Sequence, residues 1–274
     1  MQKGGSVRDQ KTSSWAYPVL LLAGVFFIAP LFAMARFAFQ NVLVIDLGWG
    51  NLFDGWSLDK ATAAFGATYF AKSLWYSVRI AALTSGLSIV VIVPTAVLIH
   101  LRLKRYRTVF EFLTLLPYVI PAIGLVAGIV VLKPYIRGFI ASDYSLIPFY
   151  AVLSLPFTYR ALDTALQSLD LDTLVSASRS LGATWTHTLF RVILPNIKTA
   201  VISGAFLTVA IVLGEYTIAD VLLKRTLPAF MVEYRGTDPR GGYALAVMTL
   251  ALTTVIFVVI GVLTRSRHDK ERSS

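Results

Sequence analysis

The stretch IAALTSGLSIVVIVPTAVLI, residues 80–99, contains no charged side chain. An α-helix rises about 1.5 Å per residue, so a stretch of this length matches the roughly 30 Å hydrocarbon core of a bilayer. Helices of soluble domains are usually shorter, at about 10–14 residues. The stretch therefore predicts a transmembrane helix, which we place at residues 74–100.

Uncharged stretches recur along the rest of the chain. Three reach the same length, and two shorter ones can span a bilayer if they borrow residues at their ends. The stretches are Trp15–Ala35, Phe112–Leu132, Tyr243–Thr264, Tyr144–Tyr159 and Thr199–Gly214. We therefore predict an all-α, polytopic integral membrane protein with six transmembrane helices, at residues 15–39, 74–100, 110–133, 144–165, 196–221 and 242–264.

The composition agrees with a membrane protein and excludes several other classes. Hydrophobic residues make up 56% of the chain and charged residues 15%, whereas soluble domains average about 45–50% and about 25%. The chain has no cysteine, which excludes disulfides, thiolate catalysis and zinc sites with cysteine ligands. The net charge of +10 comes mainly from residues at the ends of apolar stretches. A lipid bilayer explains this pattern better than a nucleic-acid partner, because no basic stripe interleaved with aromatic residues is present.

The distribution of lysine and arginine predicts the orientation. With both termini on one side, that side holds 15 lysine and arginine residues and the other side holds 8. The positive-inside rule then predicts that both termini, residues 1–14 and 265–274, are cytoplasmic, and that residues 40–72 form an extracytoplasmic loop. The first apolar stretch is longer than the core of a signal peptide, so we predict that it is a retained helix.

Two membrane-embedded features predict a translocation path. The third span contains Pro117, Tyr118 and Pro121. A helix broken by proline persists in a membrane where neighbouring helices or water satisfy the freed backbone groups, so we expect these residues to line the path.

The second feature is a carboxylate in the fifth span. Glu215 lies within the span and should face the bundle interior or a water-filled cavity, because facing lipid costs several kcal/mol. Tyr216 and Asp220 follow it, and with Glu215 they complete the predicted path. An aromatic face and carboxylates suit a cationic substrate. In the alternative interpretation, Glu215 is a structural ion-pair partner of Arg79 or Arg36.

The segment between the fourth and fifth spans is too long for a turn. Asp170 and Asp172 can cap a short helix, and Gly182 can end it in the left-handed region. Thr184 can cap a second helix, which runs toward Pro195. We predict a helix–turn–helix hairpin, residues 170–195, at the cytoplasmic surface.

A motif in this hairpin resembles a known family. Ser176-Ala177-Ser178, three residues, Gly182, nine residues, Val192, one residue and then Leu194-Pro195 is similar to the EAA signature of binding-protein-dependent ABC import permeases. That signature reads Glu-Ala-Ala, three residues, Gly, nine residues, Ile, one residue, Leu-Pro. The chain departs from it at Ser176, where the family has glutamate, and at Ser178, where the family has alanine. The resemblance extends from about Tyr69 to Leu263 and implies a type-1 ABC transmembrane domain at residues 73–264.

The resemblance implies partners and a role for the hairpin. It implies two ATPase subunits that bind ATP and magnesium, a second permease subunit that is a paralogue or a second copy, and an extracytoplasmic substrate-binding protein, in a bacterial cytoplasmic (inner) membrane. The hairpin would couple ATP hydrolysis to transport, and Asp172 could replace the missing glutamate. The residues expected in coupling are Asp172, Leu174, Ser176, Ala177, Ser178, Arg179, Leu181, Gly182, Ala183, Thr184, Trp185, Leu194 and Pro195.

The resemblance also bears on the substrate. The proline break of the third span, the stretch Pro156–Arg160 and the stretch Leu213–Thr217 look most similar to the branch that imports polyamines, ferric iron, thiamine or phosphonates. Of these we expect a polyamine. No phosphate-binding loop, zinc-protease motif or serine-hydrolase motif is present in the sequence, so we expect no catalytic site, metal or cofactor in this chain. A secondary transporter and a membrane scaffold are the alternative classes.

Overall fold

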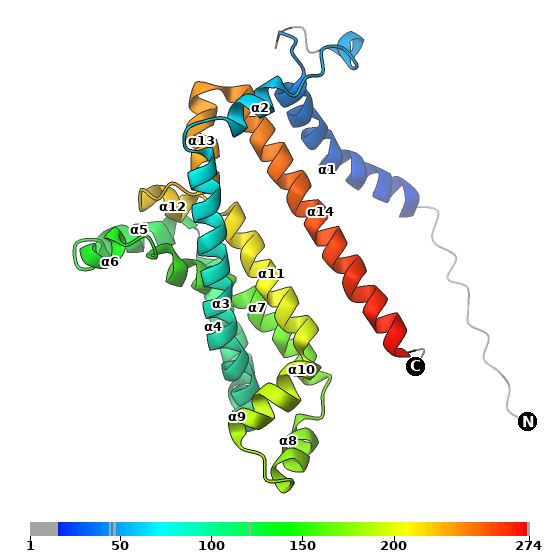
Figure 1. The fold of residues 1–274 in the computed structure, drawn as a ribbon, viewed down its shortest axis with the longest axis vertical. Helices are drawn as coiled ribbons and strands as arrows, with labels where there is room; N and C mark the ends of the chain where they lie inside the picture. Colours follow the sequence, from blue (N-terminus) through cyan, green and yellow to red (C-terminus); the bar gives the residue numbers. More distant parts are fainter. Residues whose placement is uncertain (1–15, 44, 46–47, 121, 273–274) are drawn as a thin grey trace, which may run out of the picture. The chain divides into compact units, whose positions relative to one another are not determined.

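The computed structural model describes residues 16–43, 45, 48–120 and 122–272, and these residues are helical apart from loops and one isolated bridge between Gln40 and Trp56 (Figure 1). Numbered from the N-terminus, the helices are α1 (Ala16–Phe39), η2 (Trp49–Asn51), α2 (Asp59–Phe65), α3 (Phe70–Arg102), η3 (Lys104–Tyr106), α4 (Arg107–Val119), α5 (Ala122–Leu132), α6 (Arg137–Ala141), α7 (Leu146–Gln167), α8 (Leu171–Ser180), α9 (Trp185–His187), the π-helical η4 (Thr188–Ile193), α10 (Leu194–Asn196), α11 (Lys198–Gly214), α12 (Thr217–Val221), α13 (Leu227–Thr237) and α14 (Pro239–Arg272).

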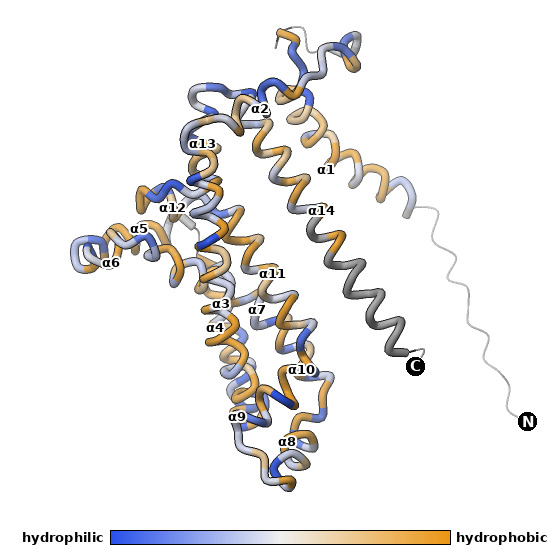
Figure 2. Tube along the Cα trace, in the orientation of Figure 1, coloured by the Kyte–Doolittle hydropathy of each residue, from blue (hydrophilic) through white to orange (hydrophobic). Residues whose placement is uncertain are grey.

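The chain divides into two units, one formed by residues up to 64 with residues 234–251, the other by residues 65–233 with those from 252 onward. In the first unit, Ala38, Ala61 and Ala244 form a small apolar cluster. The Gln40 amide donates to three backbone carbonyls of the loop that follows α1, and the Arg240 guanidinium donates to the Gln40 carbonyl oxygen. The helix α1 is hydrophobic over most of its length (Figure 2), and most of its large apolar side chains are exposed, as those of a lipid-facing helix are.

The second unit is built on a bundle of α3, α7 and α11, with α4 packed on α7 (Figure 1). Small and hydroxyl side chains let the three helices approach closely. The Ser88 and Ser154 hydroxyls lie 3.1 Å apart between α3 and α7, and the Thr158 and Thr208 hydroxyls lie 3.0 Å apart between α7 and α11. Interhelical hydrogen bonds and small residues of this kind are common where helices associate within a membrane.

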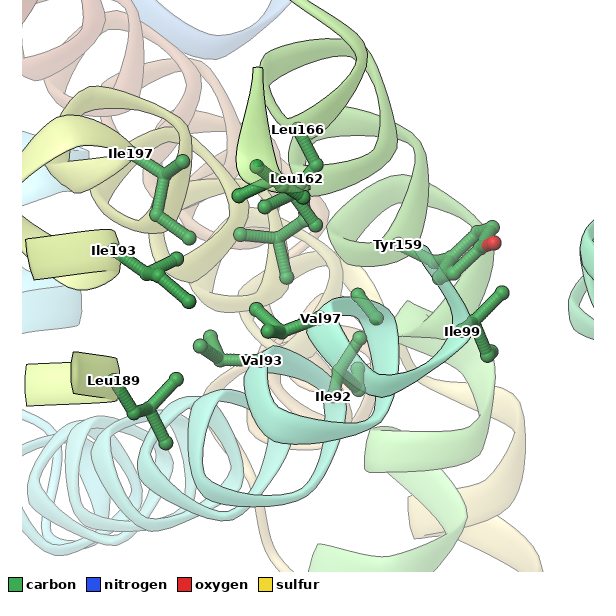
Figure 3. Close-up of a cluster of buried hydrophobic side chains, with 12 residues drawn as sticks. Ile92, Val93, Val97, Ile99, Tyr159, Leu162, Leu166, Leu189, Ile193 and Ile197 are labelled. Atoms are coloured by element: carbon green, nitrogen blue, oxygen red, sulfur yellow. The ribbon is translucent and has the colours of Figure 1, made fainter. Parts of the chain in front are cut away.

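Two apolar clusters fill the ends of this bundle. The hairpin-end cluster joins side chains of α3 and α7 to Leu189, Ile193 and Ile197 (Figure 3). The far-end cluster lies at the opposite end of the bundle and joins Ile80, Tyr150 and Val212 to side chains of α12. The bundle is therefore packed with apolar side chains at both ends.

The spans predicted from the sequence coincide with helices. Among the described residues, α1 and α3 are each long and apolar enough to cross a bilayer, and two bent helix pairs meet the same criterion if each pair is one span. The spans predicted at residues 144–165 and 242–264 coincide with α7 and α14, which are not among these candidates. The total of six crossings therefore stays a prediction.

The structure corrects the predicted shape of two spans. In the third span α4 continues through Pro117 to Val119. The break follows at Ile120, whose backbone is extended as expected for a residue before proline, and the two parts meet at 88°. Pro121 itself lies outside the described residues. The fifth span is not continuous to residue 221, because α11 ends at Gly214 and Glu215 has an extended backbone.

Candidate functional site

The hairpin predicted at residues 170–195 has defined ends. The Asp170 carboxylate accepts hydrogen bonds from the Thr173 N–H at 3.2 Å and the Thr173 hydroxyl at 2.7 Å, and these bonds lower the pKa of Asp170. Gly182, at φ +80°, ends α8 in the left-handed region that glycine favours. The Thr184 hydroxyl accepts a hydrogen bond from the His187 N–H and so caps the second arm. Local backbone chemistry therefore fixes the turn between the two arms.

A buried hydrogen bond ties the two arms together. The hydroxyls of Ser178 on α8 and Thr188 on η4 lie 2.9 Å apart, and both residues are buried. Alanine, which the EAA signature has at this position, could not form this bond. The departure at Ser178 thus has a structural explanation within the hairpin.

The hairpin presents an open groove of about 600 Å³. Leu181 at its tip is 89% exposed. Seven of the predicted coupling residues line the groove: Leu174, Ala177, Ser178, Leu181, Gly182, Ala183 and Thr184. The other predicted residues, Asp172, Ser176, Arg179, Trp185, Leu194 and Pro195, are outside this lining, although they belong to the same hairpin.

The carboxylate of Asp172 faces the segment between α3 and α4. Its Oδ2 lies 2.5 Å from Lys104 Nζ, and both side chains are more than half exposed. Asp172 thus already has an ion-pair partner within the chain. If it also replaces the missing glutamate, it must contact an ATPase subunit while it is paired with Lys104, or leave Lys104 to do so.

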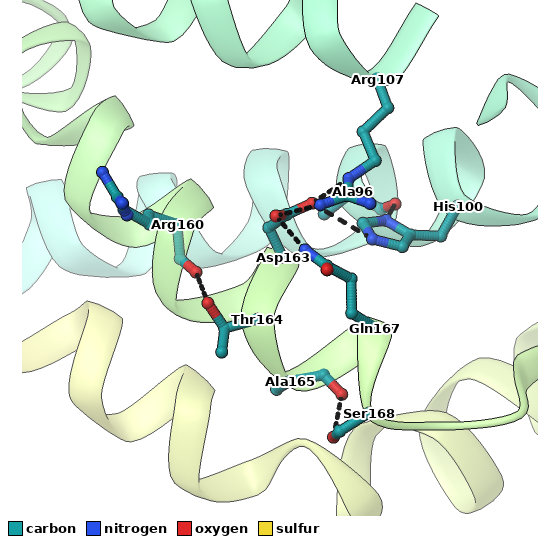
Figure 4. A network of polar contacts seen from close by, with 9 residues as sticks. All are labelled: Ala96, His100, Arg107, Arg160, Asp163, Thr164, Ala165, Gln167 and Ser168. Atoms are coloured by element: carbon teal, nitrogen blue, oxygen red, sulfur yellow. Dashed lines mark hydrogen bonds and ion pairs between the residues drawn. The ribbon is translucent and has the colours of Figure 1, made fainter. Parts of the chain in front are cut away.

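A second charged cluster at this end of the bundle was not predicted from the sequence (Figure 4). The Asp163 carboxylate on α7 is buried and receives hydrogen bonds from Arg107 Nε at 2.8 Å and Nη2 at 2.9 Å, and from Gln167 Nε2 at 2.6 Å. His100 Nε2 lies 3.2 Å from the same carboxylate, and its Nδ1 lies 2.9 Å from the Ala96 carbonyl oxygen. The hydrogen bonds that Arg107 donates to Asp163 raise the pKa of Arg107. The sequence did contain a signal for this cluster: Asp163 lies near the end of the span predicted at residues 144–165, and a carboxylate there is expected to have a cationic partner.

The predicted translocation path is only partly brought together. The Glu215 Oε1 accepts a hydrogen bond from the Ile218 N–H at 2.9 Å and so caps α12, whereas its Oε2 is buried and has no hydrogen-bond partner among the described residues. The Tyr150 hydroxyl, also buried and unbonded, lies near this carboxylate. Arg79 pairs with Asp143 at 3.8 Å. The alternative pairing of Glu215 with Arg79 is therefore not observed.

The Arg36 guanidinium bonds Gln40 and loop carbonyls within the first unit. Tyr216 and Asp220, by contrast, share a cavity of about 450 Å³ with Lys224 and Arg225. Tyr118 on α4 is half exposed and packs edge-on against Phe157, and neither it nor Pro117 lines that cavity. Of the predicted path residues that the structure describes, Tyr216 and Asp220 thus share this cavity, and the path as a whole stays a prediction.

Most of the chain is similar to known membrane transport proteins. The family model described as binding-protein-dependent transport system inner membrane component matches residues 92–268. The chain is 28% identical over 267 residues to the molybdenum transport system permease protein ModB of Mycobacterium tuberculosis, covering 90% of the chain and 93% of that protein. It is 27% identical over 183 residues to the spermidine/putrescine transport system permease protein PotB of Haemophilus influenzae, covering 61% and 63%.

A solved structure has the same fold. A bacterial ABC transporter involved in the import of the acidic polysaccharide alginate matches with a TM-score of 0.67 and 17% identity, over 96% of this chain and 99% of that one. The residues matched by the family model include both the hairpin and the break at Glu215.

Proposed function

The chain belongs to the family of binding-protein-dependent transport system inner membrane components, and from this premise we propose that it forms half of the translocation pathway of an ATP-driven importer. The other half is a second copy or a paralogue, and two ATPase subunits, which themselves bind ATP and magnesium, dock at the hairpin. A soluble binding protein delivers the substrate at the opposite side of the membrane. Family membership favours this function over a secondary transporter or a scaffold.

The hairpin is the observation that carries the proposal. It lies at one end of the bundle, it is closed by its own hydrogen bonds, and it exposes Leu181 at the tip beside an open groove. In the proposed mechanism the two ATPase subunits close on ATP and displace the hairpin. The bundle then moves with it, because Leu189, Ile193 and Ile197 are packed directly against α3 and α7 (Figure 3).

A substitution at the hairpin tip tests this function. We expect Leu181→Asp to weaken association with the ATPase subunit by about tenfold or more, as loss of an apolar anchor does at other interfaces. The measurement is co-purification of the complex in detergent, with titration of the ATPase subunit. Leu223→Asp is the matched control, since Leu223 is 85% exposed but lies in the loop after α12. Equal ATPase binding by both variants and the wild type would contradict the proposal.

The substrate we propose is a polyamine, and the cavity that contains Tyr216 and Asp220 supports it. Lys224 bonds the carbonyl oxygens of Ala141 and Ser142, and Arg225 pairs with Glu233. The remaining charged residue among the described residues that line the cavity is Asp220, whose side chain makes no ion pair and no hydrogen bond. A free carboxylate beside an aromatic ring suits an organic cation.

Ligand binding to the cognate binding protein tests the substrate class. We expect spermidine or putrescine to raise its thermal unfolding temperature, and molybdate, thiamine, ferric iron and a phosphonate to leave it unchanged. Molybdate belongs in the panel because ModB, a relative of this chain, is a molybdenum transport permease. A shift with any of the other ligands, without one for the polyamines, would replace the polyamine while leaving the importer function intact.

A further inference from the structure

A short segment, residues 104–107, carries two basic side chains that reach two different carboxylates. Lys104 Nζ lies 2.5 Å from Asp172 Oδ2, on the first arm of the hairpin. Arg107 donates two hydrogen bonds to Asp163, on α7. The same four residues of backbone are thus tied to the hairpin on one side and to the bundle on the other.

The bond to the bundle is built as a fixed point. Asp163 is buried, and both of its carboxylate oxygens accept hydrogen bonds from Arg107, with Gln167 donating a further one (Figure 4). A two-pronged arginine–carboxylate pair has a strict geometry, and breaking a buried pair leaves a charge uncompensated. Residues 104–107 therefore stay attached to α7 when either of them moves.

The bond to the hairpin has a different character. The Lys104 and Asp172 side chains are 62% and 64% exposed, and exposed pairs contribute little to stability. A cavity of about 250 Å³ lies between the two ion pairs, lined by residues that include His100, Leu169 and Leu171. The pair therefore spans a region where α8 and residues 104–107 are not closely packed.

The second arm of the hairpin is attached in another way. Leu189 and Ile193 belong to the hairpin-end cluster and pack against apolar side chains of α3 and α7 (Figure 3). That cluster can carry a displacement of the second arm to α3 and α7. A displacement of the first arm reaches α4 by another route, because Asp172 on this arm contacts Lys104, and α4 begins three residues later at Arg107.

We propose that Lys104, Asp172, Arg107 and Asp163 form a clamp that transmits the movement of α8 to α4. The clamp acts on the N-terminal end of α4, which carries Pro117 and Tyr118 of the predicted path. At its other end α4 meets the next helix, α5, at 88°. The four side chains are positioning residues, and the clamp presupposes the proposed importer function. Asp172 serves this contact within the chain and does not substitute for the missing glutamate of the EAA signature.

Charge reversal of the exposed pair tests the clamp. The experiment uses the complete importer in proteoliposomes and measures substrate transported per ATP hydrolysed. We expect Lys104→Asp and Asp172→Lys each to lower this ratio by about fivefold or more, with ATPase subunits still bound. The double variant restores an ion pair of opposite polarity, and we expect it to bring the ratio back to within about twofold of wild type. A contact that only stabilised the fold would change the amount of protein and not this ratio.

The control is an ion pair in the first unit, outside the hairpin and outside the cavity of Tyr216 and Asp220. Lys60 and Asp238 are 3.2 Å apart, with side chains 43% and 25% exposed, and we expect their reversal to leave the ratio unchanged. Unchanged ratios in both Lys104→Asp and Asp172→Lys would overturn the clamp, as would a double variant no better than either single one. Loss of ATPase subunits in Asp172→Lys, with Lys104→Asp silent, would assign Asp172 to docking instead. Absence of ATP-driven transport by the wild-type complex would contradict the importer function itself, which separates the two failures.

Discussion

Two carboxylates, one near each end of the α3–α7–α11 bundle, have contrasting surroundings. Asp163, at the hairpin end, lies within the continuous helix α7, and cationic or amide groups bond both of its oxygens. Glu215, at the far end, lies in the break between the helices α11 and α12. One of its oxygens accepts a hydrogen bond from a backbone N–H, and the other is buried without a hydrogen-bond partner in the part of the chain that the structure describes.

This difference indicates different roles for the two ends. A fully bonded buried charge makes its surroundings rigid, because any displacement breaks several bonds together. A buried oxygen with no partner carries a desolvation cost, and such groups in native structures call for an explanation. We infer that the hairpin end moves as a rigid piece, and that the far end is held by fewer bonds.

Removing Asp163 gives the largest expected effect. In Asp163→Ala the Arg107 guanidinium and the Gln167 amide lose their acceptor, and breaking a buried pair costs about 3–5 kcal/mol. Because the Arg107 side chain is 34% exposed, we expect a loss near the lower end of this range in the free energy of unfolding. Thermal unfolding of the purified permease in detergent measures it. The control is Asp143→Ala, whose carboxylate is 71% exposed, with an expected change below about 1 kcal/mol. Equal losses in the two variants would remove the contrast.

A smaller loss is expected where the two ends are joined. A Cβ added at Gly204 on α11 would lie 3.1 Å from Thr158 Cγ2 and 3.4 Å from Thr158 Cα on α7. Overpacking of this kind costs about 1–3 kcal/mol, so Gly204→Ala should lower the unfolding temperature. Gly86→Ala is the matched control, because nothing lies within 4 Å of a Cβ there, and a helical glycine replaced by alanine gains about 0.5–1 kcal/mol. If Gly204→Ala were as stable as Gly86→Ala, α7 and α11 would not be held rigidly together.

Local signals in the sequence predict much of the hairpin, and long-range pairing explains what they miss. Asp170, Thr184 and Gly182 act on backbone groups within a few residues, so the caps and the turn could be predicted. The Lys104–Asp172 and Arg107–Asp163 pairs join residues 68 and 56 positions apart. Nothing in a local pattern specifies which basic residue meets which carboxylate.

The same limit applies to the far end. Uncharged length predicts where a helix can cross a bilayer, but it does not show that α11 stops at Gly214. The chain has no proline between Pro195 and Pro228, so the usual marker of a broken helix is missing there. The break depends on tertiary packing, since α12 turns aside to pack against α5 and α7.

Substitutions at Glu215 should have modest effects on stability. Glu215→Gln keeps an oxygen that can accept from the Ile218 N–H, so we expect a change within about 0.5 kcal/mol. Glu215→Ala removes the cap of α12 and should cost about 1 kcal/mol. Unfolding in detergent separates the two variants. A loss in Glu215→Gln as large as in Asp163→Ala would mean that Glu215 is as tightly bonded as Asp163.

The smallest effect is expected for the hydroxyl that faces Glu215. Tyr150 is fully buried, and its hydroxyl has no hydrogen-bond partner. Tyr150→Phe removes an unsatisfied polar group and keeps the ring, so the free energy of unfolding should stay within about 0.5 kcal/mol or rise slightly. A double-mutant cycle with Glu215→Gln measures any coupling between the two side chains, and we expect an interaction energy below about 0.5 kcal/mol. A coupling above about 1 kcal/mol would show that the phenol bonds the carboxylate, and the far end would then be closed by its own side chains, as the hairpin end is at Asp163.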